Sequence, residues 1–229
     1  MLINPEISNV SIVLVGNFNP IIFRPEWFEK HDILSKDDTE KTKVKIVHPE
    51  ISDFQNEWLN LQVQTSKFTV STSEPPYVKL FDFVVKTFKE YLSHTPISKL
   101  GINREVHFSA NDLANRDRIG KILAPREPWG EWGKLIDAGE GEEHGGMANL
   151  TMQIKKLDDR EKGMINITVQ PSSKAYAGIL VSVNDHFELS DTTTTGYLDS
   201  NKIMDLLVKK FDTSLENSEK IINQIMGLV

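Results

Sequence analysis

Two stretches of this 229-residue chain follow the same pattern, and this repetition constrains the fold more than any other feature of the sequence. Residues 61–88 are LQVQTSKFTVSTSEPPYVKLFDFVVKTF, and residues 181–211 are VSVNDHFELSDTTTTGYLDSNKIMDLLVKKF. Each contains a strand-like segment, a phenylalanine, a Ser/Thr-rich turn, a tyrosine and an amphipathic helical pattern. Internal repeats decide the architecture of a chain because equal units pack together. We therefore expect an internal duplication.

Local patterns predict the secondary structure around these two stretches. Strands are expected where β-branched residues alternate with polar ones, and helices where apolar residues recur at spacings of three and four. The expected strands are 10–18, 40–51, the hairpin 57–72, 98–110, 147–157, 163–171 and 178–190, and the expected helices are 24–34, 75–94, 111–123 and 200–229. Ser109 is expected to cap the third helix. The fourth is expected to break near Asp212 and Thr213, because Thr213 and Glu216 have capping-box spacing.

The order strand, helix, three strands and long helix thus occurs twice, which predicts an α+β fold. Residues 1–97 would form the first β-α-β-β-β-α unit and residues 98–229 the second, together one globular unit. The two units are expected to join edge to edge into one antiparallel sheet with both long helices on one face. This topology is similar to the TATA-binding-protein fold. The chain lacks the basic, Phe-bearing DNA surface of that family, so its DNA-binding function is not expected here.

Composition narrows the classes of function. The net charge is −7 and no run of Lys and Arg is longer than a pair, which disfavours binding to nucleic acid. The chain has no cysteine, which excludes disulfides and thiolate sites. No run of 18 apolar residues occurs, so we expect a cytoplasmic protein without a membrane partner. No motif indicates a cofactor.

Three segments of the first half carry a resemblance to a known family. The runs IVLVGNFNPIIFRPEWF, FTVSTSEPPYVKLFDFVVKTF and ISKLGINREVHF resemble a family of uncharacterised, sporadically distributed bacterial proteins. The resemblance covers about the first 110 residues. The patchy distribution of that family implies a component of a bacterial genomic island or of a phage-defence complex.

The segment EPWGEWGKLIDAGEGEEHGG, residues 127–146, contains the most distinctive candidate site. It lies in an expected long loop, 125–146, and such loops are often functional. Trp is enriched among the residues that dominate protein interfaces, so we expect this loop to bind a partner, another protein or a second copy. The expected partner-binding residues are Trp129, Glu131, Trp132, Asp137, Glu142 and His144. Two alternatives remain: the tryptophans fold back onto the domain, or Asp137, Glu140, Glu142 and Glu143, with His144, hold a metal ion.

Other candidate sites are weaker. A small ligand could bind between sheet and helices near Tyr77, Phe81 and Tyr197. Asp137 followed by Gln153 and Lys155 on a strand has some of the spacing of a metal-dependent nuclease. Asp185 and His186 are neighbours on a strand and should point to opposite faces. With no complete catalytic motif in the chain, the sequence favours a non-catalytic protein-binding or assembly subunit.

Overall fold

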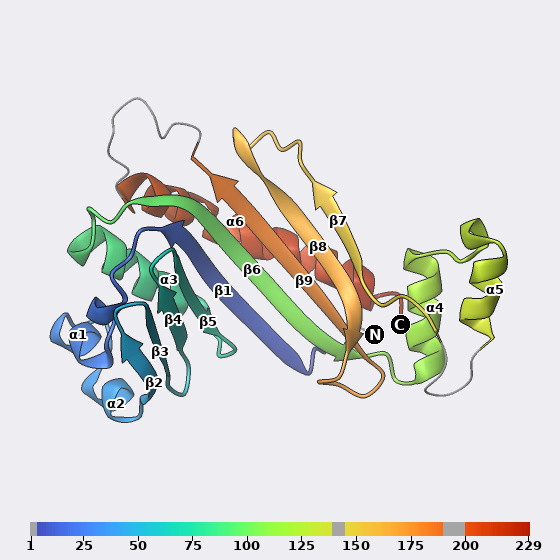
Figure 1. The fold of residues 1–229 in the computed structure, drawn as a ribbon, viewed down its shortest axis with the longest axis horizontal. Helices are drawn as coiled ribbons and strands as arrows, with labels where there is room; N and C mark the ends of the chain where they lie inside the picture. Colours follow the sequence, from blue (N-terminus) through green and yellow to red (C-terminus); the bar gives the residue numbers. More distant parts are fainter. Residues whose placement is uncertain (1–3, 139–144, 190–199) are drawn as a thin grey trace.

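A computed structural model describes residues 4–138, 145–189 and 200–229. The described chain is a mixed α/β fold built on one antiparallel sheet of nine strands, in the order β2-β3-β4-β5-β1-β6-β9-β8-β7 (Figure 1). The strands are β1 (Ile7–Gly16), β2 (Lys43–His48), β3 (Ile51–Gln55), β4 (Asn60–Gln64), β5 (Lys67–Thr72), β6 (Ile97–Ser109), β7 (Leu150–Ile154), β8 (Lys162–Ser172) and β9 (Gly178–Glu188).

The last helix, with 27 residues, is much longer than the others. The helices are α1 (Pro25–Lys30), α2 (Lys36–Glu40), α3 (Val78–Val85), α4 (Leu113–Leu123), α5 (Glu131–Asp137) and α6 (Ser200–Met226). A π-helical turn, Lys86–Tyr91, continues α3, and short 3-10 turns occupy Pro20–Ile22 and Glu127–Trp129. No helix in these described ranges is long and apolar enough to cross a membrane.

The sheet has its centre at the pair β1 and β6. These strands run antiparallel, with Ile12 opposite Ile102. On either side, the first strand of each half pairs with a strand that comes later: β1 with β5, and β6 with β9. From there each half continues outward as a meander of antiparallel strands to an edge, β2 on one side and β7 on the other.

The prediction of one strand over 40–51 was wrong, because this segment contains β2 and the start of β3. The two strands pair with each other, with His48 opposite Ile51, so the chain turns at Pro49 and Glu50. Proline has no N–H to donate to a strand ladder, and this favours a turn there. The first half therefore has five strands, one more than the expected unit.

The long helices pack on one face of the sheet. Val10, Ile12 and Leu14 of β1 are fully buried on that face, alternating with less buried residues. The rings of Phe81 in α3 and Phe211 in α6 are 5.1 Å apart, so the two helices touch each other as well as the sheet. In Figure 1, α6 starts near α3 and runs behind β6 and β9. The opposite face, the open face of the sheet, carries mainly polar side chains, with a few apolar ones such as Val13 and Leu180.

Two further predictions about helix ends were wrong. Helix α6 continues without a break from Ser200 to Met226, because Phe211, Ser218 and Ile222 keep one buried face through the expected break. Helix α4 is capped by Asp112, whose carboxylate accepts from the backbone N–H of Asn115 at 2.7 Å. Ser109 instead ends β6, where its hydroxyl donates to the carbonyl of Tyr176.

The hydrophobic core has two parts, and a polar layer separates them. The larger part includes the phenylalanine cluster of Phe18, Phe23, Phe28, Phe68 and Phe88, and the smaller part lies beneath the second half, with Val106, Val181, Val183 and Ile222. Between them lie buried polar side chains from β6, β9 and α6: Arg104, Asp185, Ser214 and Ser218.

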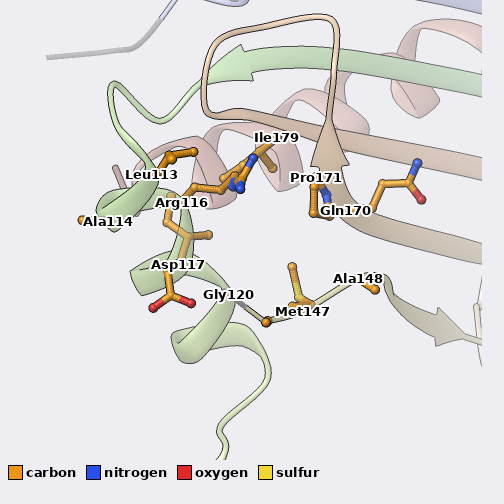
Figure 2. Close-up of a pocket in the computed structure, with 13 residues that line it drawn as sticks. Leu113, Ala114, Arg116, Asp117, Gly120, Met147, Ala148, Gln170, Pro171 and Ile179 are labelled. Carbon is orange, nitrogen blue, oxygen red and sulfur yellow. The ribbon is translucent and has the colours of Figure 1, made fainter. Parts of the chain in front are cut away.

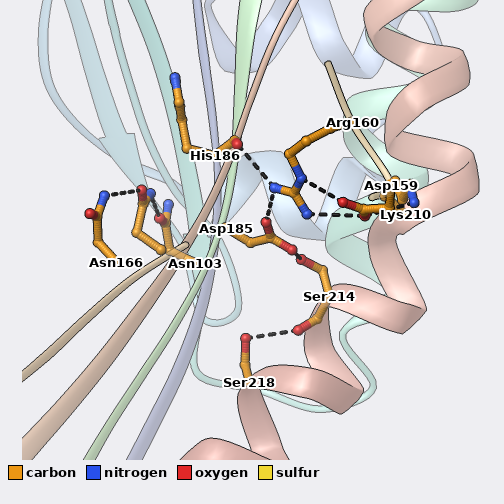
Figure 3. Close-up of polar contacts among 10 residues, drawn as sticks. Asn103, Asp159, Arg160, Asn166, Asp185, His186, Lys210, Ser214 and Ser218 are labelled. Carbon is orange, nitrogen blue, oxygen red and sulfur yellow. Dashed lines mark hydrogen bonds and ion pairs between the residues drawn. The ribbon is translucent and has the colours of Figure 1, made fainter. Parts of the chain in front are cut away.

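The polar layer is held by ion pairs and hydrogen bonds (Figure 3). Asp185 accepts hydrogen bonds from Arg160 and from the hydroxyl of Ser214. The Arg160 guanidinium lies 3.8 Å from the centroid of the Phe187 ring and also pairs with Asp159 at 2.8 Å. Hydrogen bonding from Arg160, assisted by Lys210, lowers the pKa of Asp159 to about 2. The buried charges are therefore partnered, as burial in a low dielectric requires.

Candidate protein-binding site

Helices α4 and α5 form a lobe that extends beyond the end of the sheet (Figure 1). Helix α4 anchors the lobe, since Ile119 on its inner side is fully buried in the smaller core. The guanidinium of Arg118 donates to the backbone carbonyls of Leu228 and Val229, at 2.6 and 2.9 Å. The lobe is therefore fixed to the C-terminal end of the described chain as well as to the sheet.

A cluster of four charged residues fastens α5 to α4. Arg126, which is largely buried, pairs with Asp117 of α4 and with Asp137 at the end of α5. Lys121 reaches the same two carboxylates, at 3.1 and 2.9 Å. Hydrogen bonds from Lys121, and then from Arg126, hold the pKa of Asp137 below its usual range. Asp137 therefore holds the lobe together.

Two glycines allow the close approach of α5. Gly130, before the helix, has a φ of 58° and a ψ of −125°, a conformation that residues with a Cβ rarely adopt. A Cβ at Gly133 would overlap the backbone carbonyl oxygen of Arg126. The glycines that the sequence places around the tryptophans thus set the position of a helix.

The outer face of the lobe is an apolar surface, defined by Trp129, Trp132, Leu135 and Ile136, which line one shallow hollow. Trp129 is 64% exposed, Trp132 72% and Leu135 64%. The two tryptophans therefore do not fold back onto the domain. Single exposed apolar residues are common on protein surfaces, but contiguous exposed groups usually mark contact sites.

Of the other predicted partner-binding residues, only Glu131 lies beside this surface among the described residues. Glu131 is exposed beside this surface and pairs with Lys134 at 2.7 Å. Glu142 and His144 lie outside the described residues. The expected loop 125–146 is helical over Glu127–Trp129 and Glu131–Asp137, so the prediction of a simple connection was wrong for those parts. The sequence missed these helices because the first has only three residues and the second, with seven, contains Gly133, and glycine is a poor helix former.

A metal site is not seen in the part of the chain that the structure describes. No group of three or more His, Asp or Glu side chains gathers there in a way that could hold an ion. Glu140, Glu142, Glu143 and His144, which were the candidates, fall outside that part, and Asp137 is already engaged by Arg126 and Lys121.

A cavity of about 640 Å³ lies between α4 and β8, at a place that the sequence did not indicate (Figure 2). Its lining is mainly apolar, with Leu113, Met147 and Ile179, and it includes the side chain of Arg116 and that of Gln170. These residues come from three distant parts of the chain. They come together where α4 lies beside residues 145–148 and the ends of β8 and β9, and no local pattern signals this.

The predicted ligand residues Tyr77 and Phe81 both make contacts within the fold. The Tyr77 hydroxyl is 2.9 Å from that of Ser8, and the Arg104 guanidinium is 5.2 Å from the centroid of the Tyr77 ring. Phe81 packs on Phe211 of α6. Tyr197 lies outside the described residues. Tyr77 and Phe81 therefore have packing roles between the sheet and the helices.

The residues of the nuclease hypothesis lie in different elements of the structure. Asp137 belongs to the ion-pair cluster of the lobe, whereas Gln153 on β7 donates to Asn166 on β8 at 2.9 Å. Lys155 follows β7 and is exposed.

Asp185 is buried beneath the sheet and His186 lies on the open face, as predicted. Burial, with Lys99 nearby, lowers the pKa of His186.

The open face of the sheet carries a ladder of side-chain amides that crosses four strands. Gln153 of β7 donates to Asn166, which donates to Asn184 at 3.4 Å; Asn184 donates to Asn103, which donates to Ser11 at 3.1 Å. These residues are directly opposite one another in the strand register. All donors point the same way along the row, so each amide supports the next. Figure 3 shows the part of the row between Asn166 and Asn103.

No family model and no curated protein matches this chain. The resemblance of the first half to sporadically distributed bacterial proteins therefore stays a prediction, and so does the role in bacterial defence that it implies.

Proposed function

We propose that this protein is a protein-binding or assembly subunit whose partner docks on the apolar surface of the α4–α5 lobe. The observation that supports this most is the exposure of Trp129 and Trp132 on a structured helical element. Exposing such large apolar side chains to water is unfavourable, and burying them in an interface recovers that free energy. Truncating a tryptophan at the centre of an interface costs about 2 kcal/mol or more of binding free energy.

The way the lobe is built supports a docking role. The segment 126–137 is held at both ends. Arg126 at its start pairs with Asp117 of α4, and Asp137 at its end pairs with Arg126 and with Lys121 of α4, which also pairs with Asp117. The tryptophans are therefore presented on a backbone that is ordered before binding. A preordered surface loses less conformational entropy when a partner binds.

The charges next to the surface indicate the chemistry of the partner. Glu127 and Glu131 are exposed beside the tryptophans. In the sequence, three more glutamates follow within residues 139–144. The partner should therefore present an apolar ridge with Lys or Arg at its margin, since opposite charges at the rim speed association and select partners.

The experiment is an affinity capture from native cells that compares wild type with the double variant Trp129→Ala/Trp132→Ala. Since both side chains are largely exposed, the variant should keep the melting temperature and far-UV circular dichroism of wild type. The matched control is Tyr176→Ala, which removes an aromatic side chain that is 70% exposed on the turn between β8 and β9. The proposal expects a partner that wild type and the control capture and the double variant does not. A partner retained by the folded double variant would contradict it.

The cavity between α4 and β8 favours a second function, the binding of a small molecule. Arg116 borders a largely apolar space, and the one carboxylate of its lining, Asp117, is already paired with Lys121 and Arg126, which suits an anionic ligand with an apolar body. A thermal-shift screen of such ligands tests this: stabilisation of wild type that Arg116→Ala abolishes would support it, and no stabilisation by any of them would contradict it.

We also propose that the two halves descend from one duplicated unit. In each half the first strand pairs with the last strand of a meander, and a helix on the same face follows. If the halves are copies, β1, β5, β4 and α3 should superpose on β6, β9, β8 and α6 by one rotation. A rotation that fits the strands but misplaces the helices would contradict the duplication.

A further inference from the structure

The two edges of the sheet differ in how they are protected against pairing with another strand. Edge strands expose unpaired backbone groups, and proteins usually block them with lysines, prolines or bulges. The β2 edge carries Lys43 and Lys45 and has an irregular register between Val44 and Ile46. The β7 edge, Leu150–Ile154, has the sequence LTMQI, with no charge and no proline, and its register with β8 is continuous.

The apolar side of β7 is uncovered. Met152 is 61% exposed and Ile154 42%, although both lie on the face of the sheet that the helices cover elsewhere. Helix α6 packs on β6 and β9, in the middle of the sheet, and leaves the edge bare. An additional strand beside β7 would shield these two side chains and would satisfy the free backbone groups.

The side chains of β7 are complementary to themselves in one antiparallel register. If Met152 faces Met152 of a second strand, then Leu150 faces Ile154, and both pairs lie on the apolar side. Thr151 faces Gln153 on the polar side, next to the amide ladder. Beyond the strand, Lys155 and Lys156 face Asn149 and Ala148. No like charges meet in this register, so nothing in it opposes self-pairing.

We propose that β7 pairs antiparallel with β7 of a second copy of this chain, centred on Met152, so that two sheets become one. The contact is isologous, as in most homodimers. Five residues on each side make a small interface, so the association is weak and depends on protein concentration. The β7 contact uses the edge of the sheet and does not include the tryptophan surface of the lobe. The two proposals can therefore be tested independently.

The first test measures mass against concentration by analytical ultracentrifugation, from micromolar to millimolar protein. Wild type should shift from monomer towards dimer as concentration rises. Met152→Lys should stay monomeric because two ammonium groups would meet on the two-fold axis, and its melting temperature should be unchanged since the residue is exposed. Trp129→Ala/Trp132→Ala should dimerise like wild type. A wild type that is monomeric throughout, or a Met152→Lys variant that dimerises equally well, would overturn the proposal.

The second test uses the absence of cysteine from the chain. Directly opposed residues in an antiparallel pair have Cα atoms about 4.5–5.5 Å apart, which a disulfide can span. Met152→Cys should therefore form a cross-linked dimer under mild oxidation with diamide. In the same register two copies of residue 154 would be about 13 Å apart along the strands, so Ile154→Cys should not cross-link. Ile46→Cys on β2 is the control edge. Cross-linking of Met152→Cys no faster than that of these two variants would contradict the register.

Discussion

Asp185 on β9 and Ser214 in the middle of α6 are joined by a hydrogen bond inside the protein, at the level where the hydrophobic core is interrupted. The second oxygen of the same carboxylate pairs with Arg160. The helix and the sheet are thus connected by a buried polar contact between two apolar regions. Because the contact is directional, it fixes the axial position of α6 on the sheet more specifically than apolar packing does.

Removing the carboxylate from this layer should destabilise the protein. Asp185→Leu removes one of the two carboxylates that pair with the buried Arg160, and breaking a buried pair in this way costs about 3 kcal/mol or more. The double variant Asp185→Leu/Arg160→Leu should recover part of this loss because no uncompensated charge remains. Urea unfolding of the three proteins measures both effects. Equal losses in the single and the double variant would contradict this account.

The contact of Asp159 predicts a dependence of stability on pH. Its pKa is about 2 in the folded protein, below the usual value of 3.8, because of hydrogen bonds from Arg160 and then Lys210. A lowered pKa means that the contribution to stability is present above pH 4 and is lost as pH falls towards 2. Asp159→Asn should therefore be less stable than wild type at neutral pH, by a modest amount because the side chain is partly exposed.

Thermal unfolding at a series of pH values checks this prediction. The difference in melting temperature between wild type and Asp159→Asn should shrink as pH falls from 4 towards 2. A constant difference over that range would show that charge on Asp159 is not its source.

Two glycines of the lobe should respond differently to alanine. Gly133→Ala should displace α5, because the new Cβ would overlap the backbone of Arg126, which cannot move aside as a side chain can. Gly130→Ala meets no neighbouring atom within 4 Å, so its cost is the conformational strain of a positive φ, about 1 kcal/mol. Hydrogen exchange of residues 126–137 measures both, and Gly133→Ala should show the larger loss of protection. The reverse order would contradict the packing described for α5.

The amide ladder should be sensitive to replacement in its middle. Asn184→Asp removes the amide that donates to Asn103 and places a carboxylate opposite an amide oxygen. The loss of one hydrogen bond costs about 1 kcal/mol. Asn60→Asp, on β4 of the same face, is a matched control at an exposed position outside the ladder. Denaturant unfolding should show destabilisation by Asn184→Asp and little change in the control; equal changes would assign no special role to the ladder.

Much of the fold follows from local patterns in the sequence. The hairpin of β4 and β5, the four strands β6 to β9 and both long helices were predicted, because alternation and helical spacing are strong there. One antiparallel sheet with helices on one face followed from them. A break in α6 was predicted because Thr213 and Glu216 have capping-box spacing. The helix continues there because Ser214 and Ser218 are buried, and nothing in the local sequence indicates that these polar residues are buried.

The sites depended on contacts between distant residues and were therefore harder to predict. The exposure of Trp129 and Trp132 is consistent with the expected docking role, but the reason for it, the Arg126 cluster, requires knowing that Asp117 and Asp137 lie together. The amide ladder needs the register of β6, β7, β8 and β9. Asn103 and Asn184 look like ordinary polar residues until the strands are aligned.

The position of α6 in the chain has a consequence for biosynthesis. This helix covers the apolar face of β6 and β9 and packs against α3 of the first half, yet it follows all nine strands in the sequence. While the ribosome is still adding residues before 200, the apolar underside of the sheet has no α6 to cover it. The nascent chain is therefore a natural client for chaperones that hold exposed apolar segments until that one helix can dock.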